Sequence, residues 1–153
     1  MFVVVLCAFV AYANAANRLC HGDINNLHPT GQRNGGVAAS NADAQHDLPY
    51  LEQHRSCYQA SADKHCIQAS VIAAIASRES RGGSLLTSTG GYGDNHNAWG
   101  IMQCDINHSG LNCLSCAWNS CCHIEMMTAN ILIPYINQVK SKLPSFSQDQ
   151  ALQ

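Results

Sequence analysis

The sequence predicts an α+β domain that is mainly α, with a small β-hairpin or sheet between helices. Apolar residues recur at helical spacing in two stretches, 67–76 and 124–139, and the stretch between them is rich in glycine. The chain has 153 residues, of which 46% are apolar and 12% are charged. This length and composition suffice for one hydrophobic core but not for two ordinary domains.

Residues 1–15 have the features of a secretory signal peptide. Residues 2–10 are almost wholly apolar, no charged residue precedes Arg18, and an Ala-Asn-Ala sequence at 13–15 offers a cleavage site. The apolar run is shorter than the roughly 20 residues that span a bilayer. We therefore expect residues 16–153 to form one secreted, extracellular domain with no membrane contact. A membrane anchor is the alternative, because no basic residue stands near the start.

An irregular arm is expected next, over residues 17–37, because glycines interrupt it repeatedly. Two short helices are plausible across 40–56. Ser40 would cap the first, and Pro49 would open the second, since proline is tolerated at a first helical position.

The clearest helix begins near Ile67, where apolar residues follow one another at helical spacing, and Gly82-Gly83 should end it. The turn-rich stretch 85–104 predicts the hairpin or short sheet. The last apolar pattern, over 124–139, predicts a core-facing helix. Pro134 should kink or divide that helix, because proline lacks the backbone N–H.

Loss of residues 1–15 leaves eight cysteines, and an even number in an exported chain indicates disulfides. Spacing alone leaves their pairing open. The alternative is a zinc site, because Cys113 and Cys116 lie close to Cys121, Cys122 and His123 in the sequence. We expect no metal, since Cys121 and Cys122 are adjacent, unlike the usual zinc spacing.

The formal net charge is −2 and neither sign forms long runs, so we expect no nucleic-acid partner. The eight histidines would make the protein cationic below about pH 6, which would favour contact with anionic cell walls. Eight unrelated surface imidazoles are the alternative explanation.

Glu79 stands near the end of the clearest helix. At 100° per residue it lies within about 20° to 40° of Ile72 and Ile75, so its side chain should project from the apolar face. Burial and the negative end of the helix dipole would both raise its pKa and keep a proton available. The alternative is a partly exposed glutamate paired with Arg78 or Arg81.

Asp94 and Asp105 follow in the turn-rich stretch. A protonated carboxyl facing an ionised one across a cleft is the acid and base arrangement of a glycosidase. Each aspartate also has a simpler explanation, since aspartate is common in turns and at the caps of secondary structure.

Several motifs together resemble goose-type lysozyme and, more distantly, the bacterial lytic transglycosylases. They are SRES at 77–80, GYGD at 91–94, WGIMQ at 99–103 and Asp105. The resemblance extends over nearly all of the chain after residue 15. It is closest to cysteine-rich invertebrate members.

The resemblance implies a lysozyme-like domain that cleaves β-1,4 bonds between N-acetylmuramic acid and N-acetylglucosamine in peptidoglycan, without a cofactor. Glu79 matches the general acid, and Asp94 and Asp105 match aspartates that assist the attacking water, with inversion. Cys20 and Cys66 match a pair that forms a disulfide. We expect a monomeric protein whose partner is bacterial peptidoglycan.

The resemblance also implies that the family domain continues beyond Gln153, so its C-terminal part is expected to be missing. His108 does not align cleanly with a family histidine and is not assigned to the site. Two alternative functions remain: a lytic transglycosylase, and an inactive peptidoglycan-binding protein of immune recognition.

Overall fold

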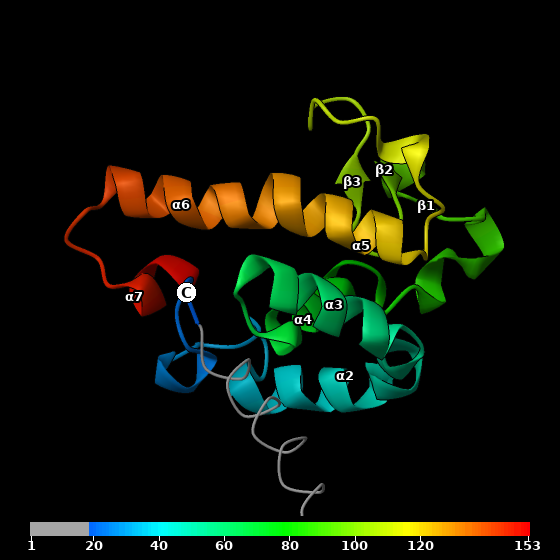
Figure 1. The fold of residues 1–153 in the computed structure, drawn as a ribbon. Coiled ribbons are helices and arrows are strands. Elements are labelled where there is room, and N and C mark those ends of the chain that lie inside the picture. Colours follow the sequence, from blue (N-terminus) through cyan, green and yellow to red (C-terminus); the bar gives the residue numbers. More distant parts are fainter. Residues whose placement is uncertain (1–18) are drawn as a thin grey trace, which may run out of the picture.

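The computed structural model describes residues 19–153, and its helices form three tiers (Figure 1). Helix α2 (Gly36–Leu51) makes the lowest tier in that view, and α3 (Arg55–His65) and α4 (Ala69–Ser80) make the middle one. Helices α5 (Cys121–Met127) and α6 (Ile133–Lys142) run across the top. The expected signal peptide lies outside the described residues.

The small sheet stands at one end of the α5–α6 run (Figure 1). It has three antiparallel strands in sequence order: β1 (Tyr92–Gly93), β2 (Ala98–Trp99) and β3 (Cys104–Asp105). The sheet and the surrounding helices confirm the predicted fold class, an α+β domain that is mainly α.

Short helical turns connect these elements. Five are 3-10 helices: Ile24–Asn26, Glu52–His54, Ser84–Thr89, Asp94–His96 and Cys113–Ser115. A final helix, α7 (Gln148–Leu152), packs against the first of these turns, in the N-terminal arm. Among residues 19–153, no helix has the length and apolarity needed to cross a membrane.

The core forms around α4. Ile72 and Ala76 of α4 are completely buried, as are Ile101 after the sheet's second strand and Ile124 of α5. These residues pack together with buried side chains of α3, which places α4 at the centre of the molecule.

The predicted boundary between two helices at Pro49 is wrong. One helix begins at Gly36, before Ser40, and continues through Pro49 to Leu51. Pro49 is tolerated because it lies in the last turn of the helix. The backbone hydrogen bond that proline cannot donate is lost there, and few helical residues follow it. The hydroxyl of Ser40 instead accepts from the backbone N–H of Gln32, so it holds the irregular arm and caps no helix.

The interruption expected near Pro134 is present, but it precedes the proline. Residues Thr128–Leu132 form a π-helical segment between α5 and α6. The wider π turn accommodates the hydrogen bond that Pro134 cannot donate. Helices α5 and α6 therefore continue as one rod in Figure 1.

Candidate functional site

Glu79 lies in the last turn of α4. The helix ends at Ser80, and the next residue, Arg81, adopts a left-handed conformation with φ of 53°. The predicted stop at Gly82 and Gly83 is therefore one residue late. The backbone N–H groups of Arg81 and Gly82 donate back to Ser77 and Ala76, which closes the end of the helix.

The carboxyl group of Glu79 is exposed, which contradicts the expected burial. The helical pattern correctly places the side chain of Glu79 on the same side of α4 as Ile75. No other part of residues 19–153 covers its carboxyl group. The exposure agrees with the alternative explanation, but the arginine pair does not form, because Glu79 has no hydrogen bond or ion pair within those residues.

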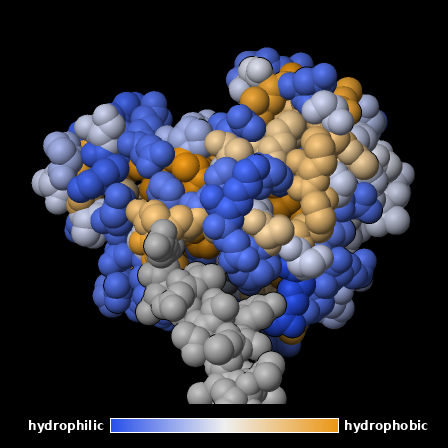
Figure 2. All heavy atoms as spheres, viewed as in Figure 1, coloured by the Kyte–Doolittle hydropathy of each residue, from blue (hydrophilic) through white to orange (hydrophobic). Residues whose placement is uncertain are grey.

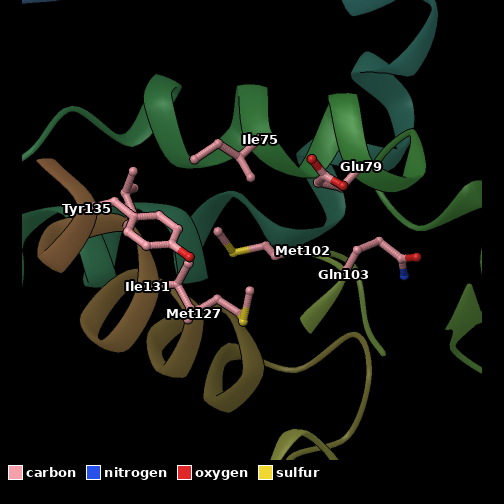
Figure 3. Close-up of a pocket in the computed structure, with 8 residues that line it drawn as sticks. Ile75, Glu79, Met102, Gln103, Met127, Ile131 and Tyr135 are labelled. Carbon is pink, nitrogen blue, oxygen red and sulfur yellow. The ribbon is translucent and has the colours of Figure 1, made fainter. Parts of the chain in front are cut away.

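A pocket of about 290 Å³ opens beside Glu79. Ile75 and Glu79 of α4 form one wall, and residues from the α5–α6 helix form the other. The full lining is Ile75, Glu79, Met102, Gln103, Met127, Ile131, Leu132 and Tyr135. In Figure 3, Glu79 and Gln103 lie at one end, Tyr135 lies at the other, and Met102 lies between them.

The pocket is therefore apolar along most of its length and polar at one end. Figure 2 shows that apolar residues also reach the surface beside α6. Among the large apolar side chains described, Tyr135 of α6 is the most exposed, at 62%. A ligand in this pocket would meet apolar side chains along most of its length and the polar groups of Glu79 and Gln103 at one end.

Neither candidate aspartate lines the pocket: Asp105 ends strand β3 and Asp94 directly follows strand β1. In the register of the strands, Gly93 pairs with Ala98, and Ala98 pairs with Asp105. Adjacent strands stand about 4.8 Å apart, so the backbones of Gly93 and Asp105 lie about 10 Å apart. Asp94 follows Gly93 directly, and both aspartates are exposed at the same end of the sheet.

The backbone at Asp94 is unusual. Asp94, Asn95 and His96 have φ values of 44°, 52° and 70°, and such left-handed conformations are uncommon outside glycine. Asparagine, aspartate and histidine are the residues that adopt them most readily. Strained backbone of this kind is concentrated at functional sites.

Asp105 is held by its own turn. One carboxylate oxygen accepts the backbone N–H groups of Asn107 and His108, each at 2.9 Å. The His108 backbone N–H contributes most and the Asn107 N–H next, and together they hold the pKa of Asp105 below its usual value. Asp105 therefore stays ionised and suits the role of a base or a water-orienting group.

Two residues of this region were not assigned from sequence. The imidazole of His108 lies 3.1 Å from the carboxylate of Asp105, and their spacing of three residues was the available signal. Gln103 lies within a quoted motif but received no role. Its side chain lines the pocket beside Glu79 and donates to the carbonyl of Gly100 at 2.8 Å.

All eight cysteines of residues 19–153 form disulfides. The pairs are Cys20–Cys66, Cys57–Cys121, Cys104–Cys113 and Cys116–Cys122. The first is the pair that the family resemblance implies. The four cysteines that the zinc alternative needs therefore all belong to disulfides, two of them with partners outside that cluster.

Comparison with known proteins gives a consistent assignment. The family model described as "Lysozyme g" matches residues 21–153. A lysozyme g of Struthio camelus is 33% identical over 144 residues, covering 87% of this chain and 67% of that protein. A lysozyme g of Epinephelus coioides is 35% identical over 147 residues, covering 86% of this chain and 75% of that protein.

A longer protein of Lottia gigantea, named "Glycine, glutamate and proline-rich protein", is also similar. It is 49% identical over 140 residues, which cover 84% of this chain. The chain spans 33% of the length of that protein and about two thirds of the length of the Struthio camelus lysozyme g.

Proposed function

Because the chain belongs to the lysozyme g family, we propose that it is a muramidase acting on bacterial peptidoglycan. Its residues 16–153 would form the catalytic domain, or part of one. The reaction is hydrolysis of the β-1,4 bond between N-acetylmuramic acid and N-acetylglucosamine, in antibacterial defence or digestion.

The observation that carries this proposal is the position of Glu79. It is a carboxyl group with no hydrogen bond or ion pair in residues 19–153, at the polar end of an otherwise apolar pocket. A saccharide lying over that end would exclude water from Glu79, which favours the neutral carboxylic acid. A neutral Glu79 can protonate the glycosidic oxygen as the bond breaks.

Asp94 and Asp105 take the opposite role in the proposal. Both are exposed, and the turn around Asp105 keeps that carboxylate charged. An ionised carboxylate orients or deprotonates the attacking water on the other face of the sugar. Inversion requires about 6.5 to 9.5 Å between acid and base, so that the water fits between them.

The cysteine chemistry supports secretion. Four disulfides in a chain of this size indicate an oxidising compartment, and residues 1–15 have the composition of a signal peptide. We propose an extracellular, monomeric enzyme without a cofactor.

The test is digestion of purified peptidoglycan by the oxidised protein and by Glu79→Gln. Loss of a general acid typically costs about 10² to 10⁴ in rate, so Glu79→Gln should lose at least about a hundredfold in kcat. Glu52→Gln is the matched control, because Glu52 is a glutamate outside the pocket, paired with Arg55. It should cleave at the wild-type rate.

Mass spectrometry of the products separates the alternatives. Reducing N-acetylmuramic acid ends support hydrolysis, whereas anhydro-muramic ends identify a transglycosylase. Saccharide binding without any cleavage, equal in wild type and Glu79→Gln, would instead identify a binding protein.

A further inference from the structure

The peptide group between Ile101 and Met102 is buried and directly precedes the pocket residue Gln103. Ile101 is fully buried and Met102 is 3% exposed. The next residue, Gln103, reaches the pocket beside Glu79. The orientation of this peptide group therefore determines where the side chains of Met102 and Gln103 lie.

Two buried side chains hold the two polar atoms of this one peptide group. The hydroxyl of Ser80 donates to the carbonyl oxygen of Ile101 at 2.7 Å. The backbone N–H of Met102 donates to Nε2 of His123 at 3.3 Å. Ser80 and His123 are themselves fully buried, so neither bond competes with water.

Close packing restricts the position of the His123 ring. A Cβ atom on Gly100 would lie 2.4 Å from the imidazole ring, so the ring packs directly on the glycine backbone. On the other side, the N–H of Ile101 donates to the carbonyl of Trp118 at 2.9 Å. The turn leading to Gln103 is thus held from α4, from α5 and from the segment before α5.

His123 must be neutral to accept this bond. With Nε2 as the acceptor, the ring hydrogen is on Nδ1, which has no hydrogen-bond partner within residues 19–153. Burial lowers the pKa of His123 to about 4, which keeps the acceptor nitrogen unprotonated at neutral pH.

We propose that Ser80 and His123 are positioning residues, which clamp the Ile101–Met102 peptide group and so fix Gln103 relative to Glu79. This inference rests on the proposed function, because Glu79 and Gln103 are taken as the reacting end of the pocket. Ser80 directly follows Glu79, so its bond to Ile101 joins the end of α4 to the Gln103 turn.

The test compares Ser80→Ala, His123→Phe and His123→Gln in the full, oxidised chain, with peptidoglycan as substrate. Phenylalanine keeps a planar ring but removes the acceptor, whereas the glutamine oxygen restores an uncharged acceptor. Misplacement by about 1 Å costs on the order of 10²-fold. Ser80→Ala and His123→Phe should therefore lose at least about tenfold in kcat with KM changed less than about threefold, and His123→Gln should recover most of the loss.

Thr128→Val is the matched control for lost buried polarity. Thr128 is fully buried, and its hydroxyl bonds only to the carbonyl of Ile124, one turn earlier in α5. A loss of kcat in Thr128→Val equal to that in His123→Phe would overturn the proposal. So would wild-type kcat in His123→Phe, or failure of His123→Gln to recover activity while folding normally.

Amide hydrogen exchange at Met102 provides a readout that needs no substrate. Exchange should be slow in the wild type, faster by at least about tenfold in His123→Phe, and slow again in His123→Gln. If the wild type cleaves no peptidoglycan, the proposed function fails. The clamp is then judged by exchange alone, and unchanged exchange at Met102 in His123→Phe would overturn it.

Discussion

At the scale of single residues, Gly93 determines how closely the sheet approaches the pocket. A Cβ atom at this position would lie 1.8 Å from the side-chain oxygen of Gln103. The backbone of Gly93 is extended, with φ of −122°, so the glycine is required by close approach and not by its conformation.

Gly93→Ala should therefore displace the Gln103 amide with little loss of stability, because the obstructing atoms are at the end of a flexible side chain. We expect a free energy of unfolding within about 1 kcal/mol of wild type, and a kcat/KM at least about tenfold lower. Urea denaturation and peptidoglycan digestion measure the two quantities. In a Gln103→Ala background the same change should cost nothing further, and an undiminished effect there would show that Gly93 acts by another route.

His123 also makes stability depend on pH. Its pKa is about 4 in the folded chain and about 6.5 when unfolded, so the unfolded chain binds one more proton between these values. The contribution of neutral His123 to the free energy of unfolding is complete above about pH 6.5 and is lost as the pH falls towards 4. The loss amounts to about 3 kcal/mol.

The melting temperature should thus decrease between pH 6.5 and 4, and this decrease should be smaller in His123→Gln.

Glu125 contributes to the pH dependence of stability at lower pH than His123 does. Burial opposes its ionisation, but hydrogen bonds from Lys64, His65 and Ser61 outweigh burial and lower the pKa of Glu125 to about 2. Its stabilisation is therefore lost only between about pH 4.5 and 2. Identical pH profiles for wild type and His123→Gln would contradict the assignment to His123.

At the scale of elements, α5 depends on its N-cap. The hydroxyl of Ser120 accepts the backbone N–H of His123 at 3.2 Å, which satisfies one of the free donors of the first turn. This cap also sets the start of the helix that carries His123.

Ser120→Ala should lower the free energy of unfolding by about 1 kcal/mol, measured by urea denaturation. Ser120→Asp is the control, because aspartate is an equally good cap and its charge suits the positive end of the helix dipole. Equal stability of the alanine and aspartate variants would show that the cap contributes nothing.

The elements also show which features the sequence could predict. Apolar periodicity located α4 and the α5–α6 helix because helices are local, and each contributes an apolar stripe to the core. Periodicity could not show that Pro49 lies inside α2, since packing of neighbouring helices decides whether a proline in the last turn is tolerated.

The site was predictable in part for the same reason. Helix geometry placed Glu79 on the pocket side of α4, but its exposure depends on segments distant in sequence. The bonds around the Ile101–Met102 peptide group join residues about 20 positions apart, and no local pattern reveals them. The site roles of Glu79, Asp94 and Asp105 remain predictions.

At the scale of the whole molecule, a disulfide and a carboxylate attach the first residues of the N-terminal arm to two distant parts of the chain. The Cys20–Cys66 disulfide joins it to the end of α3. The carboxylate of Asp149 in α7 accepts the backbone N–H of Asp23 at 2.7 Å and the side-chain amide of Asn26 at 2.9 Å. The arm therefore joins the start of the described chain to its last helix, α7.

Removal of the disulfide by Cys20→Ser with Cys66→Ser should lower the free energy of unfolding by about 4 kcal/mol, as expected for a closed loop of this length. Urea denaturation of the otherwise oxidised protein measures the change. A loss below about 1 kcal/mol would mean that the arm opens independently of the helical tiers. Asp149→Asn keeps the covalent link and should cost about 1 kcal/mol or less.

The neighbouring cysteines at the start of α5 have a consequence for the route by which the chain acquires its disulfides. Cys122 bonds to Cys116, only 6 positions away, whereas Cys121 bonds to Cys57, 64 positions away. Short loops close at a smaller entropic cost, so we expect the thiol of Cys116 to be oxidised before that of Cys57. Cys121 and Cys122 compete as its partner, and thiol–disulfide exchange between these two neighbours should then decide between native and scrambled pairings.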